Sequence, residues 1–145
     1  MRLTDFTDFG MRVLMRLAGE PARGFTVEAI AEEFGLSRDH LAKIVRRLAV
    51  SGFVKTQRGA GGGLGLARDP AAIRLGEVVR ALEASYPMVE CFKPGGGHCR
   101  LSPGCRLKVR FARAQDAFLS DLNASTLADI AWTPPVARRE VKKLA

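Results

Sequence analysis

Residues 26–68 read TVEAIAEEFGLSRDHLAKIVRRLAVSGFVKTQRGAGGGLGLAR, and the pattern in these residues predicts the fold. Thr26 is a suitable N-cap for a short helix that ends at Gly35, and Ser37 is a suitable N-cap for a second, basic helix. The apolar face of the second helix consists of Leu41, Ile44, Val45 and Leu48. Two short helices joined by a tight glycine turn, the second one basic, are the sequence form of a helix-turn-helix.

The residues after Gly52 predict a β-hairpin. FVKTQR alternates apolar and polar residues, GAGGG forms a turn, and LGLAR alternates again. A hairpin directly after a recognition helix is a wing, and its glycines allow positive φ and a close approach to a phosphodiester. A nucleotide-binding loop is disfavoured, because it requires a helix directly after the glycines and a Walker lysine.

Apolar residues at three- and four-residue spacings predict further helices on both sides of this stretch. They indicate a first helix over residues 4–18, a short helix ending near residues 86–87, and a long helix over residues 107–122. The respective stripes are Phe6, Phe9, Val13, Leu14 and Leu17; Leu75, Val78, Val79 and Leu82; and Leu107, Phe111, Ala114, Phe118 and Leu122. The long stripe favours contact with its copy in a partner subunit, with packing against the chain's own first helix as the alternative.

The predicted fold is therefore mostly α with a small β-hairpin wing: a winged helix-turn-helix DNA-binding domain plus a long dimerisation helix, in a homodimer. Thr126 is expected to open one further turn through Trp132. The expected organisation is a winged helix-turn-helix domain (1–86), a cysteine loop (87–106), the dimerisation helix with a short following helix (107–132), and a basic, poorly ordered tail (133–145).

Composition favours a nucleic-acid partner. The chain has 145 residues, the length of one domain, and a formal net charge of +8. An odd number of cysteines without an apolar N-terminal run predicts a cytoplasmic protein, and no stretch approaches the roughly 20 apolar residues of a membrane span. The sequence contains no plausible pairing of nucleophile and base, so an enzyme is not expected.

Positive charge concentrates on the predicted DNA-binding elements, where residues 38–58 contain six Lys or Arg and one acid. Double-stranded DNA is the expected partner, because the first two turns of a recognition helix reach base edges and later residues reach phosphates. Ser37, Arg38, Asp39, His40 and Lys43 are the expected base-edge residues, Arg47 a phosphate contact, and Arg58, Gly61 and Gly62 the wing contacts.

All three cysteines lie in residues 91–105, CFKPGGGHCRLSPGC, with the spacing C-x7-C-x5-C. Thiols this close favour a metal site over scattered structural cysteines, with three free thiols as the alternative. Zinc bound with His98 as fourth ligand is possible, although adjacent His98 and Cys99 side chains point apart. An iron-sulfur cluster tolerates the wide spacing and suits soft thiolates, but one iron lacks a cysteine.

Residues 1–18, 35–68 and 73–83 together with the three cysteines resemble the IscR and NsrR family of bacterial winged-helix iron-sulfur regulators. The resemblance covers the chain to about residue 132. It is closer to the nitric-oxide-sensing NsrR branch, because the IscR branch has a histidine ligand three residues after the last cysteine, where this sequence has Lys108.

The resemblance implies that Cys91, Cys99 and Cys105 hold a 4Fe-4S cluster, with a 2Fe-2S cluster as the alternative. It also implies that Asp8 from the partner's first helix is the fourth ligand, and Asp5 is the nearby alternative. The implied function is a repressor that releases palindromic operators when nitric oxide reacts with its cluster. The alternatives are a regulator whose cluster senses redox or iron status, or one with a structural zinc.

Overall fold

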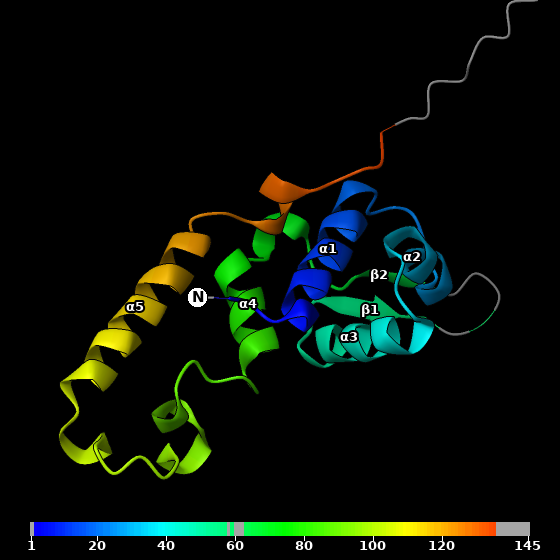
Figure 1. The fold of residues 1–145 in the computed structure, drawn as a ribbon. Helices are drawn as coiled ribbons and strands as arrows, with labels where there is room; N and C mark the ends of the chain where they lie inside the picture. The colour runs from blue at the N-terminus through cyan, green and yellow to red at the C-terminus, as the bar shows by residue number, and fades with distance from the viewer. Residues whose placement is uncertain (1, 58, 60–62, 136–145) are drawn as a thin grey trace, which may run out of the picture.

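The computed structural model describes residues 2–57, 59 and 63–135 and consists mostly of helices with one small hairpin (Figure 1). The α-helices and strands in chain order are α1 (Asp5–Gly19), α2 (Val27–Phe34), α3 (Arg38–Val50), β1 (Val54–Thr56), β2 (Leu64–Leu66), α4 (Leu75–Glu83) and α5 (Arg106–Leu122). The short 3-10 helices are η1 (Pro70–Ala72), η2 (Glu90–Phe92), η3 (Pro94–Gly96), η4 (Ser102–Gly104) and η5 (Leu127–Ile130). The order confirms the predicted mostly α fold with a small β-hairpin wing.

Helices α2 and α3 form the helix-turn-helix through the predicted caps. The backbone N–H of Ala29 donates to the Thr26 side chain, and that of His40 donates to the Ser37 side chain. Gly35 ends α2 at φ +65°, a left-handed conformation that glycine adopts without steric cost. The tight turn between the two helices is therefore set by local sequence.

The hairpin is antiparallel and shorter than the alternating pattern predicted. Val54 pairs with Leu66 and Thr56 with Leu64, while an isolated bridge joins Leu64 to Phe25 ahead of α2. This bridge attaches the base of the wing to the helix-turn-helix. The predicted wing contacts Arg58, Gly61 and Gly62 lie outside the described residues.

The hydrophobic core lies between α1, α3 and α4. The predicted stripe residues Val13, Leu14, Leu41, Ile44 and Val78 are each at most 1% exposed. Burial of each large aliphatic side chain contributes about 1.5–3 kcal/mol relative to exposure, so the stripes account for the packing of these helices.

A buried ion pair holds α2 to α1. The Arg16 side chain is 1% exposed, and its Nε and Nη1 lie 2.8 Å from Glu33 and 2.6 Å from Glu20. The hydrogen bond from Arg16 lowers the pKa of Glu20. Because burying the guanidinium unpaired would be costly, its contact with Glu33 fixes the first helix of the helix-turn-helix against α1, while Glu20 pairs with it from the end of α1.

Helix α5 packs mainly against α4 and extends away from the helix-turn-helix (Figure 1). Gly76 permits the close approach, since a Cβ there would lie 2.2 Å from the Leu119 carbonyl oxygen. Leu119 is the one described residue of α5 that is buried. Most of the predicted apolar stripe of α5 thus remains at least partly exposed in the single chain.

The chain returns to α1 after α5. Thr126 and Asp129 form a capping box at the start of η5, which confirms the predicted further turn, and two hydrogen bonds from Thr126 lower the pKa of Asp129. The Trp132 N–H then donates to the Met15 carbonyl at 3.0 Å. The predicted tail of residues 133–145 falls largely outside the described residues. No helix in the described part of the chain is long and apolar enough to cross a membrane.

Candidate DNA-binding face and cysteine loop

The exposed side of α3 carries most of the predicted base-edge residues. Ser37, Arg38, Asp39 and Lys43 are all exposed, as is Arg46 one turn further along. They begin at the N-terminus of α3, which is the end that a recognition helix inserts into the major groove. The arrangement suits direct contact with a duplex.

Arg38 is already engaged with a neighbouring acid. Its Nε donates to Glu28 Oε1 on α2, in an ion pair whose side chains are 67% and 58% exposed. This hydrogen bond lowers the pKa of Glu28 and raises that of Arg38. A DNA phosphate would compete with Glu28 for the guanidinium.

His40 faces the protein rather than solvent. Its ring is half-buried, with centroids 6.4 Å from Phe6 and 6.1 Å from Phe9, both in edge-on geometry. His40 therefore lies in the contact between α3 and α1. The sequence signal that could have found this contact is the aromatic pair in the first apolar stripe.

Arg47 also faces inward, towards α4. Its Nε and Nη2 donate to the Ala81 carbonyl oxygen at 3.2 and 3.0 Å, and its side chain is half-buried. The structure thus separates the basic residues of α3 into an outward set and one inward residue.

The cysteine loop consists of short 3-10 turns between α4 and α5. Cys91, Cys99 and Cys105 are free thiols of intermediate exposure, and Cys105 occupies the N-cap position of α5. The glycines at positions 95–97 have φ of +80°, +83° and +63°, values that other L-residues rarely adopt. The glycine run is thus required by the path of the loop.

Contacts around Glu90 fold the middle of the loop back towards its start. The His98 N–H donates to Glu90 Oε1 at 3.1 Å, and a Cβ on Gly97 would lie 2.6 Å from the Glu90 carbonyl oxygen. Glu90 directly precedes Cys91, and His98 directly precedes Cys99. The same contacts therefore bring the chain segments of these two cysteines together.

Three thiolates fit an iron-sulfur cluster in their chemistry, since soft sulfur donors are its usual ligands. Within the described part of the chain, however, no three His, Cys, Asp or Glu side chains form a group ready to hold a metal ion. The loop accordingly has to tighten for Cys91, Cys99 and Cys105 to share one cluster. His98 is exposed, and its hydrogen bond to Glu90 is made by the backbone N–H and not by the imidazole ring.

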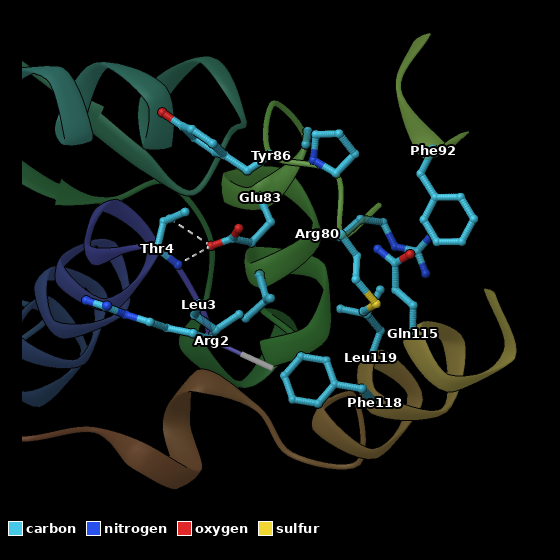
Figure 2. Close-up of a pocket in the computed structure, with 14 residues that line it drawn as sticks. Arg2, Leu3, Thr4, Arg80, Glu83, Tyr86, Phe92, Gln115, Phe118 and Leu119 are labelled. Carbon is cyan, nitrogen blue, oxygen red and sulfur yellow. Dashed lines mark hydrogen bonds between the residues drawn. The ribbon is translucent and has the colours of Figure 1, made fainter. Parts of the chain in front are cut away.

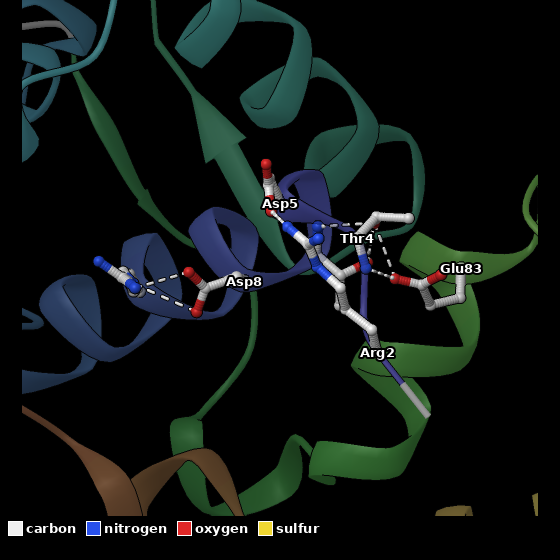
Figure 3. A network of polar contacts seen from close by, with 7 residues as sticks. Arg2, Thr4, Asp5, Asp8 and Glu83 are labelled. Atoms are coloured by element: carbon white, nitrogen blue, oxygen red, sulfur yellow. Dashed lines mark hydrogen bonds and ion pairs between the residues drawn. The ribbon is translucent and has the colours of Figure 1, made fainter.

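Asp8 is an exposed residue of α1 (Figure 3). Its two carboxylate oxygens accept hydrogen bonds from Arg12 at 3.2 and 2.6 Å, and the side chain is 49% exposed. Asp5, the alternative, pairs with Arg2 at 3.1 Å. Within a single chain the structure does not bring Asp8 into a group with the three cysteines.

A cavity of about 590 Å³ separates the N-terminal segment from the start of the cysteine loop (Figure 2). Helices α4 and α5 form its walls, and its aromatic lining includes Tyr86, Phe92 and Phe118. Beside it, Glu83 Oε1 accepts hydrogen bonds from the Thr4 N–H at 2.9 Å and the Thr4 hydroxyl at 2.8 Å. This contact joins the end of α4 to the beginning of α1.

Comparison with known proteins gives a family match over nearly the whole chain. Residues 3–133 match the Rrf2 model, described as an iron-dependent transcriptional regulator. The HTH-type transcriptional regulator NsrR of Bacillus subtilis is 43% identical over 131 residues, covering 90% of each protein. The regulator of the same name from Geobacillus kaustophilus is 42% identical over 131 residues, covering 90% of this chain and 89% of that protein.

Solved structures agree with these relatives. CymR, the global cysteine regulator of B. subtilis, superposes with a TM-score of 0.69 at 28% identity, covering 90% of this chain and 96% of that chain. T. potens IscR has a TM-score of 0.69 at 27% identity, covering 90% and 85% of the respective chains. These relatives are transcriptional regulators rather than enzymes.

Proposed function

The chain belongs to the Rrf2 family of transcriptional regulators, and we propose that it is a DNA-binding repressor that senses nitric oxide through an iron-sulfur cluster. Its DNA-binding surface is the exposed side of α3 together with the wing. Ser37, Arg38, Asp39 and Lys43 would read base edges, and Arg46 would contact phosphates. Arg58, Gly61 and Gly62 would extend this surface into the minor groove.

The observation that carries the cluster proposal is that all three cysteines are free, half-buried thiols within one glycine-rich loop that ends at the start of α5. Cys91, Cys99 and Cys105 would hold a 4Fe-4S cluster, the alternative being 2Fe-2S. When bound, the cluster supplies iron that reacts with nitric oxide. The positive, N-terminal end of the α5 dipole would further stabilise the thiolate form of Cys105.

Asp8 of the partner subunit would provide the fourth ligand. Among the described residues its one ion pair is with Arg12 of the same helix, and its exposed position makes its carboxylate available for exchange. A carboxylate is a harder and more exchangeable ligand for cluster iron than a thiolate. Asp8 would therefore mark the reactive position of the cluster and also link the two subunits.

A homodimer is supported by the apolar side chains that α5 leaves uncovered. Leu107, at the start of the predicted stripe, is 59% exposed in the first turn of α5, and the stripe residues Phe111, Ala114 and Phe118 that follow it are partly or fully exposed. A second copy of α5 would cover them, and would place two recognition helices on a palindromic operator. Loss of the link through Asp8 would change the spacing of these helices, which gives two states of different DNA affinity.

The experiment that tests the cluster is anaerobic reconstitution followed by iron, sulfide and zinc analysis. We expect a brown protein with iron and sulfide in equal amounts. The triple substitution of Cys91, Cys99 and Cys105 by Ser should remain colourless and folded. A colourless wild-type protein with one zinc per chain would contradict the sensor and favour a structural metal held with His98.

A further inference from the structure

Arg47 is the residue of α3 whose contact is not explained by DNA binding. Its Nε and Nη2 converge on a single acceptor, the Ala81 carbonyl oxygen, at 3.2 and 3.0 Å. Ala81 lies among the last four residues of α4, whose carbonyls lack intrahelical partners. A guanidinium is well suited to this position, because a cation is stabilised near the negative end of a helix.

The end of α4 is a junction between three parts of the molecule. Arg47 reaches it from α3, and Thr4 reaches it from the start of α1 through Glu83. The chain then passes directly from Glu83 into the segment that leads to Cys91. A displacement of the cysteine loop would therefore act on the helix end that Arg47 of α3 contacts.

We infer that Arg47 is a positioning residue that couples the end of α4 to the recognition helix, rather than a phosphate contact. This inference rests on the proposed function, since it assigns the route by which the cysteine loop affects DNA binding. The geometry requires arginine, because a lysine has a single ammonium at the end of a flexible chain and lacks the planar fork that meets the carbonyl twice.

The two roles of Arg47 predict different responses to substitution. If Arg47 contacts a phosphate, Arg47→Lys keeps the positive charge and DNA affinity should change little. Arg47→Gln should then lower the slope of log affinity against log salt concentration by about one, the value for one lost phosphate contact. If Arg47 is a positioning residue, both variants should lose the coupling between the cysteine loop and DNA binding, and the salt dependence of DNA affinity should stay the same. Arg46→Gln is the matched control, because Arg46 is the exposed neighbour on the same helix.

The experiment measures operator affinity of the cluster-loaded and cluster-free protein over a range of salt concentrations, with iron content and Tm recorded for each variant. In Arg47→Lys we expect the ratio of the two affinities to fall by at least about fivefold, which is the lower end of typical allosteric coupling. Iron content and salt slope should match wild type. Arg46→Gln should keep the ratio and reduce the slope by about one.

An unchanged affinity ratio in Arg47→Lys overturns the inference, even if Tm falls, because a purely structural loss lowers the active fraction of both forms alike. A salt slope reduced by about one in Arg47→Gln also overturns it and makes Arg47 a phosphate contact. If the wild-type protein binds its operator equally with and without cluster, the proposed function fails, and this result is separate from any effect of Arg47.

Discussion

Asp8 is the single residue on which the proposed sensing chemistry depends most. Because its ion pair with Arg12 is half-exposed, Asp8→Ala should change the free energy of unfolding of the cluster-free protein by less than about 1 kcal/mol. The same substitution should alter cluster lifetime or the rate of reaction with nitric oxide, measured by anaerobic stopped-flow absorbance. The matched control is Asp5→Ala, which removes the neighbouring pair with Arg2.

If Asp8→Ala behaves as wild type in both measurements, the fourth ligand is Asp5, His98 or solvent. If Asp5→Ala alone alters the cluster, the ligand moves by one turn of α1 and the cross-subunit link is retained with a different residue.

Glu28 restrains Arg38 at the DNA-binding face. Since the hydrogen bond from Arg38 lowers the pKa of Glu28, the ion pair persists above that lowered pKa and is lost only as the pH falls through it. Glu28 therefore competes with phosphates at neutral pH, and Glu28→Gln should raise operator affinity by about two- to fivefold. Fluorescence anisotropy with labelled operator measures this change.

Glu32→Gln is the control for net charge, because Glu32 is exposed on the same helix and forms no ion pair among the described residues. Equal gains from both substitutions would assign the effect to overall charge and remove the specific role of Glu28.

At the scale of an element, the glycine run of the cysteine loop is the feature most open to test. Gly97 combines φ +63° with a Cβ position 2.6 Å from the Glu90 carbonyl oxygen, so Gly97→Ala strains the backbone and displaces the turn. We expect it to reduce iron incorporation severalfold, as measured per folded protein. Gly104→Ala in the same loop should retain iron, because a Cβ added there would meet no atom within 4 Å and the φ of Gly104 is not positive.

Equal iron content in the two glycine variants would show that the observed turn around Glu90 is not needed for cluster binding. The loop would then adopt a different path when it holds metal.

Helix α5 makes a second prediction at this scale. Leu107→Glu should weaken the dimer by at least about tenfold, because it places a charge where a second apolar helix face is expected. Val50→Glu on α3 is the control, since Val50 is 78% exposed and lies on a different element. Analytical ultracentrifugation of the cluster-free proteins gives both dissociation constants, and an unaffected dimer in Leu107→Glu would place the interface elsewhere.

The elements themselves could be predicted from sequence, because capping residues and apolar spacings are local signals. Thr26, Ser37 and Gly35 defined the helix-turn-helix, and the stripe of α5 gave its length to within one residue. The direction of individual side chains on α3 could not be predicted in this way. His40 and Arg47 lie seven residues apart on one side of the helix, and only the packing of α1 and α4 shows that this side is covered.

At the scale of the whole molecule, the described contacts divide the chain into a connected body and a projecting arm. The body is held by Arg16 between α1 and α2, by Glu83 between α4 and the start of α1, and by the return of Trp132 to α1. The cysteine loop and the first half of α5 form the arm (Figure 1). The arm is where the proposed cluster and the second subunit would meet.

This division explains why the candidate metal site could be predicted only in part. The spacing of the cysteines indicates a soft metal, but a single chain does not gather Cys91, Cys99 and Cys105 into a metal-binding group. The proposed cluster and second copy would supply interactions that packing within one chain does not. In the proposed loaded dimer, the ligand set would therefore depend on the second copy as well as on local sequence patterns.

In the proposed mechanism, nitric oxide releases a cluster-loaded dimer from DNA. The most direct test of this mechanism is an anaerobic titration of one loaded sample with nitric oxide, in which operator binding and the visible spectrum are followed together. We expect operator affinity to fall in step with the spectral change, to the level of the protein in which Cys91, Cys99 and Cys105 are replaced by Ser. Operator binding that stays constant while the spectrum changes would contradict it.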